Sequence, residues 1–388
     1  MKLYLSENQL TVNEDISVTW GEPLVTIPFS RSEASTAITI ANTHSIKPLV
    51  GILAGEHQTK SFSGNEKAFQ RIQLALQKQG GLAYVFTPKG WHSDRVHAAI
   101  YDFKNNKWIH AYFPHPNVVY NRIPFRRQET KRSFQNIREA CDIRNIPFFN
   151  DSFLQKSEIF EWLSKNEHLV SYLPVTKNLT NLDSFYSMMK QFKKVYLKPS
   201  SGKKGKGIIV VEQINKNEWK VETVKDSFSN IETTELIENW ISPKIVDHYI
   251  IQQGIQPLKW NGTRFDYRVL VHRKNKKEFI ISGIGVRQSQ KQEITTHLPA
   301  GGKIIPFRSL PFQEDEIAIH SIVNEIGNTI NSQSRTFGEF SIDMGKSVTG
   351  ELYIFEINAK PMVFDEDDIR AQGLENLTRY FRYLSEKR

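Results

Sequence analysis

Short apolar runs and amphipathic stretches alternate along the chain, and this pattern predicts a mixed α/β protein. Between residues 66 and 79, apolar side chains recur at helical spacing and stop at a pair of glycines, as at the end of a helix. Apolar runs bounded by turn residues predict strands in the same region, at residues 24–29, 49–53 and 82–86. These patterns predict that the N-terminal part of the chain forms a separate α/β unit.

The remaining chain predicts two further parts. A helical pattern follows Lys156, and two strand patterns at residues 195–199 and 208–211 enclose a glycine-rich loop. The C-terminal part alternates strand patterns with a helix over residues 319–330 and ends in a helix over residues 368–384. We predict an N-terminal α/β domain, a middle part with the glycine-rich loop and a C-terminal part, at residues 1–125, 126–250 and 251–388.

Composition narrows the class of protein. The 388 residues are 39% hydrophobic and 11% aromatic, which is typical of a soluble globular protein, and no apolar run reaches the ~18 residues of a membrane span. The N-terminus becomes polar too early for a secretory signal. Cys141 is the only cysteine, which excludes an intrachain disulfide and a cysteine-rich metal site. Both facts favour a reducing, cytoplasmic environment.

The charge balance is moderately positive and has several possible explanations. The chain has 51 Lys and Arg against 42 Asp and Glu, a net charge of +9. Nucleic acid, an anionic surface or an acidic substrate could each account for this excess. The sequence has no zinc finger, no basic region with heptads and no RNA-binding aromatic signature. We therefore prefer general solvation or the attraction of an anionic ligand over nucleic acid as the explanation.

The glycine-rich loop between the two middle strands is a candidate phosphate-binding device. Lys198 ends the first strand, and glycines and lysines then alternate, which suits the close approach of backbone N–H groups to a polyphosphate. The loop is not a P-loop, because the β-branched residues after it predict a strand instead of a helix. A basic hairpin turn is the alternative. The loop residues concerned are Ser200, Ser201, Gly202, Gly205, Lys206 and Gly207.

A second cluster of polar residues lies on two predicted strands between residues 337 and 361. If these strands pair as a hairpin, Asp343 approaches Glu356 and Asn358. Two carboxylates and an amide oxygen are hard ligands that suit Mg²⁺. A solvated polar face on an edge hairpin is the alternative, but Glu356 and Asn358 each have apolar neighbours on both sides. The pattern favours the metal site.

Another strand predicted over residues 263–273 alternates apolar and charged residues. Arg264 and Arg268 share one face with Asp266 between them, so they could clamp an anionic group while the carboxylate orders the guanidinium forks. An ion-pair ladder on an open sheet is the alternative reading.

These features occur in the order found in ATP-grasp proteins. The motifs are Lys156 ahead of a helix, LPVT, VYLKP with its glycine loop, YIIQQGI, FDYRVLV, HLPAGG and FEINAKP. Over residues 121–361 the chain resembles the ATP-grasp superfamily, and within it the endospore coat-associated proteins of the YheC/YheD type. The resemblance implies an α/β (α+β) ATP-grasp fold with an N-terminal α/β domain of the pre-grasp type.

The resemblance also implies a role for each matching residue. Lys156 and Lys198 would contact the phosphates of ATP, and the loop from Ser200 to Gly207 would close over them. Arg268, together with Lys198, would stabilise the transferring phosphoryl group. The hinge residues Gln252, Gln253 and Ile255 would lie beside adenine and ribose, and one or two Mg²⁺ ions, or Mn²⁺ in their place, would be held by Asp343, Glu356 and Asn358.

Two positions depart from the family pattern. A glutamate that often meets the ribose hydroxyls is replaced by Gln252-Gln253, and His297 stands where an asparagine is frequent. The departures put the ribose contact and the role of His297 in question.

The expected function is that of an ATP- and Mg²⁺-dependent carboxylate–amine ligase that works through an acyl phosphate. Its partners would be small-molecule or peptide carboxylates and amines, together with spore coat proteins. The alternative is a non-catalytic ATP-binding component of the coat, and a nucleic-acid-binding protein is the weakest reading. The expected location is the cytoplasm, in association with the endospore coat.

Overall fold

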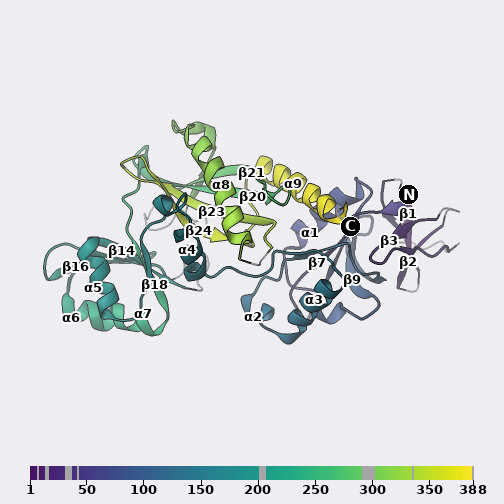
Figure 1. Ribbon diagram of the computed structural model, residues 1–388, viewed down its shortest axis with the longest axis horizontal. Helices are drawn as coiled ribbons and strands as arrows, with labels where there is room; N and C mark the ends of the chain where they lie inside the picture. Colours follow the sequence, from purple (N-terminus) through teal and green to yellow (C-terminus); the bar gives the residue numbers. More distant parts are fainter. Residues whose placement is uncertain are drawn as a thin grey trace.

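Three large sheets, each in its own unit, make up most of the molecule (Figure 1). The computed structural model describes residues 1–6, 8–13, 17–30, 37–41, 43–200, 207–290, 302–333 and 336–386. In Figure 1 the middle unit lies at the lower left, the C-terminal sheet at the centre and the N-terminal unit at the right. Helices and sheets occur in every unit, which confirms the α/β (α+β) class.

The N-terminal sheet has nine strands, and its parallel strands are buried on both faces. β7, β8 and β11 consist of buried residues, as expected for parallel strands that are covered by helices on two sides. The strand order is β12-β11-β7-β8-β9-β10-β2-β1-β5. The bounds are β1 (Lys2–Ser6), β2 (Gln9–Val12), β5 (Ala37–Thr39), β7 (Leu49–Leu53), β8 (Leu82–Phe86), β9 (Val96–Asp102), β10 (Lys107–Phe113), β11 (Val118–Asn121) and β12 (Phe148–Phe149).

Helices cover the two faces of this sheet. α3 (Arg132–Ile143) packs in the hydrophobic core on one side, and α1 (Glu66–Gln77) packs on the other side. The short α2 (Arg126–Glu129) and η1 (Pro88–Gly90) lie in connections. The helix predicted over residues 66–79 is thus confirmed, with Asn65 as its N-cap acceptor.

One predicted strand of this unit is much shorter than expected. Instead of residues 24–29, only β4 (Val25–Thr26) forms, in a small sheet of order β4-β3-β6 with β3 (Thr19–Trp20) and β6 (Ser45–Ile46). Pro28 interrupts the run because it lacks an N–H for the ladder. The side chain of Leu24 is 64% exposed, so the apolar run does not mark a core strand.

The middle unit is an antiparallel six-stranded sheet of order β13-β18-β14-β15-β16-β17 with its own core. β14 and β15 pair as the predicted hairpin on either side of the glycine-rich loop. The strands are β13 (Thr176–Asn178), β14 (Lys194–Pro199), β15 (Ile209–Gln213), β16 (Glu218–Thr223), β17 (Ser227–Glu232) and β18 (Tyr249–Gln253). The helices are α5 (Leu182–Gln191), α6 (Thr233–Glu235), the π-helix η3 (Leu236–Ile241) and α7 (Ser242–Val246).

The C-terminal sheet has the order β22-β21-β20-β23-β24, with β19 paired to β20. The core on one of its faces contains α8 and α4, whereas α9 contacts β20 and β21. The strands are β19 (Lys259–Trp260), β20 (Thr263–Arg273), β21 (Phe279–Gln288), β22 (Lys303–Ile305), β23 (Glu339–Lys346) and β24 (Leu352–Asn358). The helices are α4 (Lys156–Ser164), η2 (Val170–Tyr172), η5 (Phe307–Ser309), α8 (Asp315–Asn331) and α9 (Asp367–Glu386).

Packing crosses the limits predicted from the sequence. β12 pairs with β11 in the N-terminal sheet although it lies beyond residue 125, and α4 contributes Ile159, Phe160 and Leu163 to the core of the C-terminal sheet. α9 also packs on the N-terminal unit, and Figure 1 shows it between the two. Contacts thus cross both predicted limits, and the division of the chain at residues 125 and 250 stays a prediction from sequence.

A buried polar cluster joins the N-terminal and C-terminal sheets. The Tyr120 hydroxyl donates to Glu339 Oε2 at 2.5 Å, and Arg122 Nη1 donates to the same oxygen at 2.9 Å. His272 Nε2 lies 3.4 Å from Glu339 Oε1. Burial opposes ionisation of Glu339, but Arg122, His272 and Tyr120 outweigh it and lower the pKa of this carboxyl to about 2. The cluster fixes β11 against β23, the strand that also carries Asp343.

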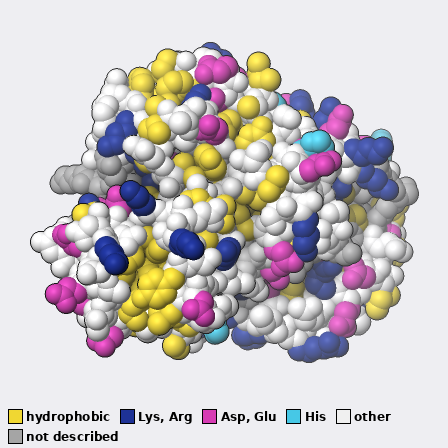
Figure 2. All heavy atoms as spheres, turned by 60° about the vertical axis from the view of Figure 1, so that its left-hand side comes forward, with side chains coloured by type: hydrophobic (Ala, Val, Ile, Leu, Met, Phe, Trp, Pro, Cys, Tyr) yellow, Lys and Arg dark blue, Asp and Glu magenta, His cyan; other side chains and the backbone are white. Residues whose placement is uncertain are grey.

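None of the described helices is long and apolar enough to cross a membrane. Seen with the middle unit turned forward, the surface carries Lys, Arg, Asp and Glu side chains intermixed (Figure 2). On this face the positive charge of the chain is not gathered into a single basic field of the kind that nucleic-acid binding favours.

Candidate active site

A cavity of about 1060 Å³ lies where the three units meet. β14 and β18 of the middle sheet contribute Lys198 and Gln252 to its lining, and β23 and β24 of the C-terminal sheet contribute Asp343 and Glu356. The connection after β11 adds residues of the N-terminal unit. Polar residues that lie far apart in the sequence, and that the sequence analysis had assigned to a site, thus line the same cavity.

Lys198 lies at the C-terminal end of β14 and is held in place by β18. Its Nζ donates to Gln252 Oε1 at 2.5 Å, and Gln252 Nε2 donates to Thr176 Oγ1 at 2.9 Å. Burial of the ammonium and the nearby charge of Lys156 lower the pKa of Lys198 to about 7, although Glu356 acts in the opposite direction. Lys198 is therefore partly neutral near pH 7, and an anionic ligand beside it would favour its protonated, charged form.

The predicted hinge residues occupy the same strand and the turn after it. Gln252 is buried and orients Lys198, as described above. Gln253 Oε1 accepts a hydrogen bond from the Val175 amide at 3.2 Å, and Ile255 lines the cavity beside it. Their contact with adenine and ribose stays a prediction.

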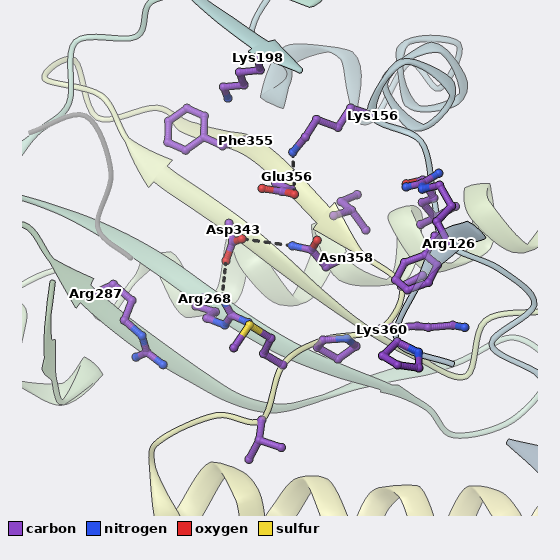
Figure 3. A pocket seen from close by; sticks show the side chains of 18 of the residues that line it. Arg126, Lys156, Lys198, Arg268, Arg287, Asp343, Phe355, Glu356, Asn358 and Lys360 are labelled. Atoms are coloured by element: carbon purple, nitrogen blue, oxygen red, sulfur yellow. Dashed lines mark hydrogen bonds and ion pairs between the residues drawn. The ribbon is translucent and has the colours of Figure 1, made fainter. Parts of the chain in front are cut away.

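The predicted metal ligands come together on β23 and β24. Asp343 pairs in register with Glu356, and Ser341 with Asn358. Asn358 Nδ2 lies 3.4 Å from Asp343 Oδ2, and Lys156 Nζ lies 2.6 Å from Glu356 Oε1 (Figure 3). Arg268 Nη1 lies 3.8 Å from Asp343 Oδ1. Each carboxylate thus forms an ion pair with a cation that also lines the cavity.

A β-bulge changes which residues of β24 face this cavity. The pairing shifts between Asp343 and Met344, whose partners are Glu356 and Ile354, so Phe355 is an extra residue. Strict alternation would place Ile354 on the face of Glu356, but Ile354 is fully buried in the core, whereas Phe355 lines the cavity.

The ring of Phe355 packs beside two cations of the cavity. Its centroid lies 5.8 Å from Lys198 Nζ and 5.7 Å from Arg264 Cζ. Strict alternation along β24 would place Phe355 on the face opposite Glu356, and the bulge is the reason why it lines the cavity instead.

β20 presents its charged face to the cavity and its apolar face to the core, as the alternation predicts. Arg264 forms a two-pronged interaction with Asp266, with Nη2 at 3.1 and 3.0 Å from the two carboxylate oxygens. Arg268 instead faces Asp343. The two arginines therefore have different partners, and Arg268 is the one directed at Asp343.

The predicted lid is described only at its two ends. Ser200 Oγ donates to the His248 carbonyl at 2.5 Å. Gly207 has φ of +75°, and a Cβ at this position would lie 2.8 Å from the Tyr249 hydroxyl, so glycine is required there. Ser201, Gly202, Gly205 and Lys206 of the predicted loop lie outside the described residues, as does His297.

Several lining residues were missed from sequence. Arg126, Arg287 and Lys360 were not assigned to the site from the sequence, yet all three line the cavity. Asn121 and Arg122, at the end of β11 and just after it, are bonded to Glu129 and Glu339 within the protein. No local signal marks these roles, because each depends on contacts between distant segments.

The residues present fit a magnesium ion. Within the described part of the chain no group of three or more His, Cys, Asp and Glu side chains forms a metal cluster. Asp343, Glu356 and Asn358 nevertheless offer two carboxylates and one amide, a set of hard oxygen donors that leaves positions for water and phosphate. This donor set suits Mg²⁺ or Mn²⁺ and does not suit a soft metal.

Comparison with known proteins identifies the family. A model of YheC/D-like ATP-grasp domains matches residues 145–384. The chain belongs to the YheC/D-like ATP-grasp family. This assignment confirms the resemblance noted from the sequence motifs.

Relatives extend the match beyond the domain. The chain is 26% identical to endospore coat-associated protein YheD of Bacillus subtilis over 384 residues, which cover 92% of this chain and 83% of the relative. It is 22% identical to endospore coat-associated protein YheC of the same organism, over 78% of this chain and 87% of the relative.

A solved structure confirms the ATP-grasp fold. The D-alanine–D-alanine ligase of Coxiella burnetii superposes with a TM-score of 0.51 at 10% identity, over 88% of this chain and 98% of the ligase. At 10% identity this similarity supports the fold and nothing further.

Proposed function

We propose that this protein is an ATP- and Mg²⁺-dependent ligase that joins a carboxylate to an amine. The observation that carries the proposal is the meeting of Lys156, Lys198 and Arg268 with the Asp343–Glu356 pair in one cavity. Three cations directed at one space can neutralise a polyphosphate, and paired carboxylates suit the cation that accompanies it. The name of the C. burnetii neighbour, a ligase, agrees with this chemistry.

The proposed reaction has two steps. A carboxylate oxygen of the first substrate attacks the γ-phosphorus of ATP, the bond to the β-phosphate oxygen breaks, and ADP and an acyl phosphate result. The amine of the second substrate then attacks the acyl carbon, the acyl C–O bond breaks, and inorganic phosphate leaves as the amine proton is lost to solvent. This chemistry relies on positioning and charge neutralisation and needs no protein nucleophile.

The side chains of the cavity divide these tasks. Lys198 and Lys156 would hold the phosphates, and the loop from Ser200 to Gly207 would close over them. Arg268 would meet the charge that develops on the transferring phosphoryl group. Asp343, Glu356 and Asn358 would hold Mg²⁺, which when bound neutralises phosphate charge.

Nucleotide recognition and location complete the proposal. Gln252, Gln253 and Ile255 would contact adenine and ribose from β18 and its turn. The relatives are named endospore coat-associated proteins, which supports an association of this protein with the coat, on the cytoplasmic side that the sequence predicts. Its substrates would be small-molecule or peptide carboxylates and amines, and coat proteins would be further partners.

A turnover experiment tests the proposal. The protein is incubated with MgATP and a mixture of amino acids and short peptides, while ADP release and new masses are followed. Substrate-dependent ADP release together with a product lighter by one water than its two components is expected. Asp343→Asn should lose both signals, whereas Asp226→Asn, at an exposed position of the middle unit, should keep them.

The absence of any product and of ADP release across the mixture would refute the ligase. The alternative is tested by comparing a deletion strain with a strain that carries Asp343→Asn. If deletion disturbs coat assembly and Asp343→Asn supports it normally, a structural role in the coat is favoured over catalysis. That outcome is separable from misfolding, because the variant would still bind the coat.

A further inference from the structure

Past Lys156 and Lys198, the cavity extends to an end that is lined by the segment after β11, by Phe153 and by the segment after β24. We call it the Arg126 end and define it by Phe125, Arg126, Phe153, Met362 and Val363, all of which line the cavity. Ligand pockets typically measure about 300–1,000 Å³, and this cavity, at about 1060 Å³, lies just beyond that range. It therefore offers room for a second ligand beside a nucleotide.

Arg126 differs from the other arginines of the cavity in its charge balance. Among the described residues, every other lining arginine has a carboxylate oxygen within 4.0 Å, and Arg126 has none; the other arginines are Arg122, Arg264, Arg268 and Arg287. Arg126 Nη2 donates to the Leu154 carbonyl at 2.8 Å. A guanidinium has five N–H donors in a planar fork, so this contact leaves capacity for a ligand.

The surroundings of Arg126 confirm that its charge is incompletely balanced. Burial lowers the pKa of Arg126, and the more distant Glu129 and Glu158 only partly offset this effect. Glu129 is also bound to Lys360 and accepts from Asn121, so its charge is shared. An anion that binds at Arg126 would supply the missing counter-charge.

Apolar side chains are exposed at the same end. Phe125, Met362 and Val363 are 48%, 55% and 38% exposed, although large apolar residues are normally buried. The Phe153 ring lies beneath two cations, with its centroid 5.5 Å from Arg126 Cζ and 4.6 Å from Lys360 Nζ. Figure 3 shows Arg126 and Lys360 together, away from Arg287 and Lys198. Because Lys360 is already paired with Glu129, the Arg126 end combines the Arg126 guanidinium with an apolar wall.

We propose that the Arg126 end binds the non-reacting carboxylate of an amino-acid or peptide substrate with an apolar side chain. The guanidinium of Arg126 takes the carboxylate as a fork, and the side chain lies against Phe125, Met362 and Val363. The reacting group of the same substrate then extends toward Arg268 and Asp343 in the same cavity. This inference rests on the proposed ligase function and specifies its substrate.

Binding of defined peptides tests the inference. The protein is saturated with Mg²⁺ and a non-hydrolysable ATP analogue and mixed with dipeptides ending in Leu, Phe, Ser or Lys, each as free acid and as C-terminal amide. Saturation-transfer NMR and calorimetry then give relative affinities. The free acids that end in Leu or Phe should bind at least about tenfold more tightly than their amides, because a charge-assisted hydrogen-bonded pair is lost in the amide.

Matched variants assign the effect to Arg126. Arg126→Gln should abolish the preference for acid over amide, and Arg126→Lys should keep part of it, because the charge remains but the fork does not. Arg127→Gln removes the same charge from the next residue of α2, which does not line the cavity, and should keep the full preference. Binding of the ATP analogue should be the same in all variants, which also shows that each is folded.

Equal binding of acids and amides, or a preference that survives in Arg126→Gln, would overturn the inference. A preference for the peptides that end in Ser or Lys would overturn its apolar part. These results leave the ligase proposal standing as long as Mg²⁺-dependent nucleotide binding is present. Loss of nucleotide binding in the wild type would instead refute the proposed function itself.

Discussion

The depressed pKa of Lys198 predicts that nucleotide affinity falls as the pH rises above 7. In the structure, burial and the neighbouring Lys156 bring the pKa of this ammonium to about 7, so the free protein loses the Lys198 charge above that pH. Nucleotide phosphates next to Nζ favour the charged form and raise this pKa in the complex. Binding above pH 7 therefore requires uptake of a proton, and proton uptake weakens binding as the pH increases.

The size of the effect follows from linkage. If the pKa of Lys198 in the complex lies above 9, the dissociation constant rises by a factor approaching ten per pH unit above pH 7. Between pH 7 and 9 this amounts to about 50-fold. The same linkage predicts uptake of close to one proton per nucleotide bound at pH 8. The phosphates of the magnesium complex are already ionised in this range and do not mask the change.

Calorimetry with Mg²⁺ and a non-hydrolysable ATP analogue measures both quantities, in buffers of different ionisation enthalpy at constant ionic strength. Lys198→Arg should flatten the dependence, because a guanidinium stays charged throughout the range. Lys193→Arg, at an exposed position of the same segment, should reproduce the wild-type slope. A dissociation constant that stays flat from pH 7 to 9 in the wild type, or an unchanged slope in Lys198→Arg, would refute the reasoning.

Three further changes probe the site and its framework. Glu356→Gln should lower Mg²⁺-dependent turnover at least about 100-fold with little change in melting temperature, and a wild-type response to Mg²⁺ titration would contradict its role as a ligand. Glu339→Gln should lower the free energy of unfolding by about 3 kcal/mol at pH 7, because Arg122 then stays buried without its counter-charge. Since the pKa of Glu339 falls from 4.5 to about 2 on folding, the wild type should lose this stability as the pH drops through that window, and denaturation curves of the variant should change less there. Gly327→Ala should cost about 1–3 kcal/mol, as a Cβ would lie 2.3 Å from the Phe279 ring, while Asn328→Ala on the exposed side of α8 should be nearly neutral in the same denaturant assay.

Local patterns in the sequence determined the elements that carry the site. The alternation over residues 263–273 placed Arg264, Asp266 and Arg268 on one face, and β20 shows that arrangement. The strands on both sides of the glycine-rich loop form the predicted hairpin. Helical and strand periodicities depend on neighbours a few residues apart, so a single sequence reports them well.

Irregularity within an element was not visible in the pattern. A strictly regular β24 would have placed Ile354 beside Glu356, but one extra residue turned Phe355 into the cavity. The Phe355 ring packs over Gly345, where a Cβ would lie only 2.4 Å from the ring. Whether β24 is regular or bulged therefore depends on a contact with the neighbouring strand β23, which the pattern of β24 alone does not show.

By itself, then, the sequence determined the class of fold, the strand hairpins and the polar faces that carry Lys198, Arg268, Asp343 and Glu356 into the cavity. Only the tertiary structure decided how the units close around them. Tyr120 and Glu339 bond across 219 positions of the chain, and Arg126 meets Met362 and Val363 in a cavity that neither segment forms alone. Such contacts follow from the packing of whole sheets and helices, and no local periodicity records which distant charges will end up paired and which will be left for a ligand.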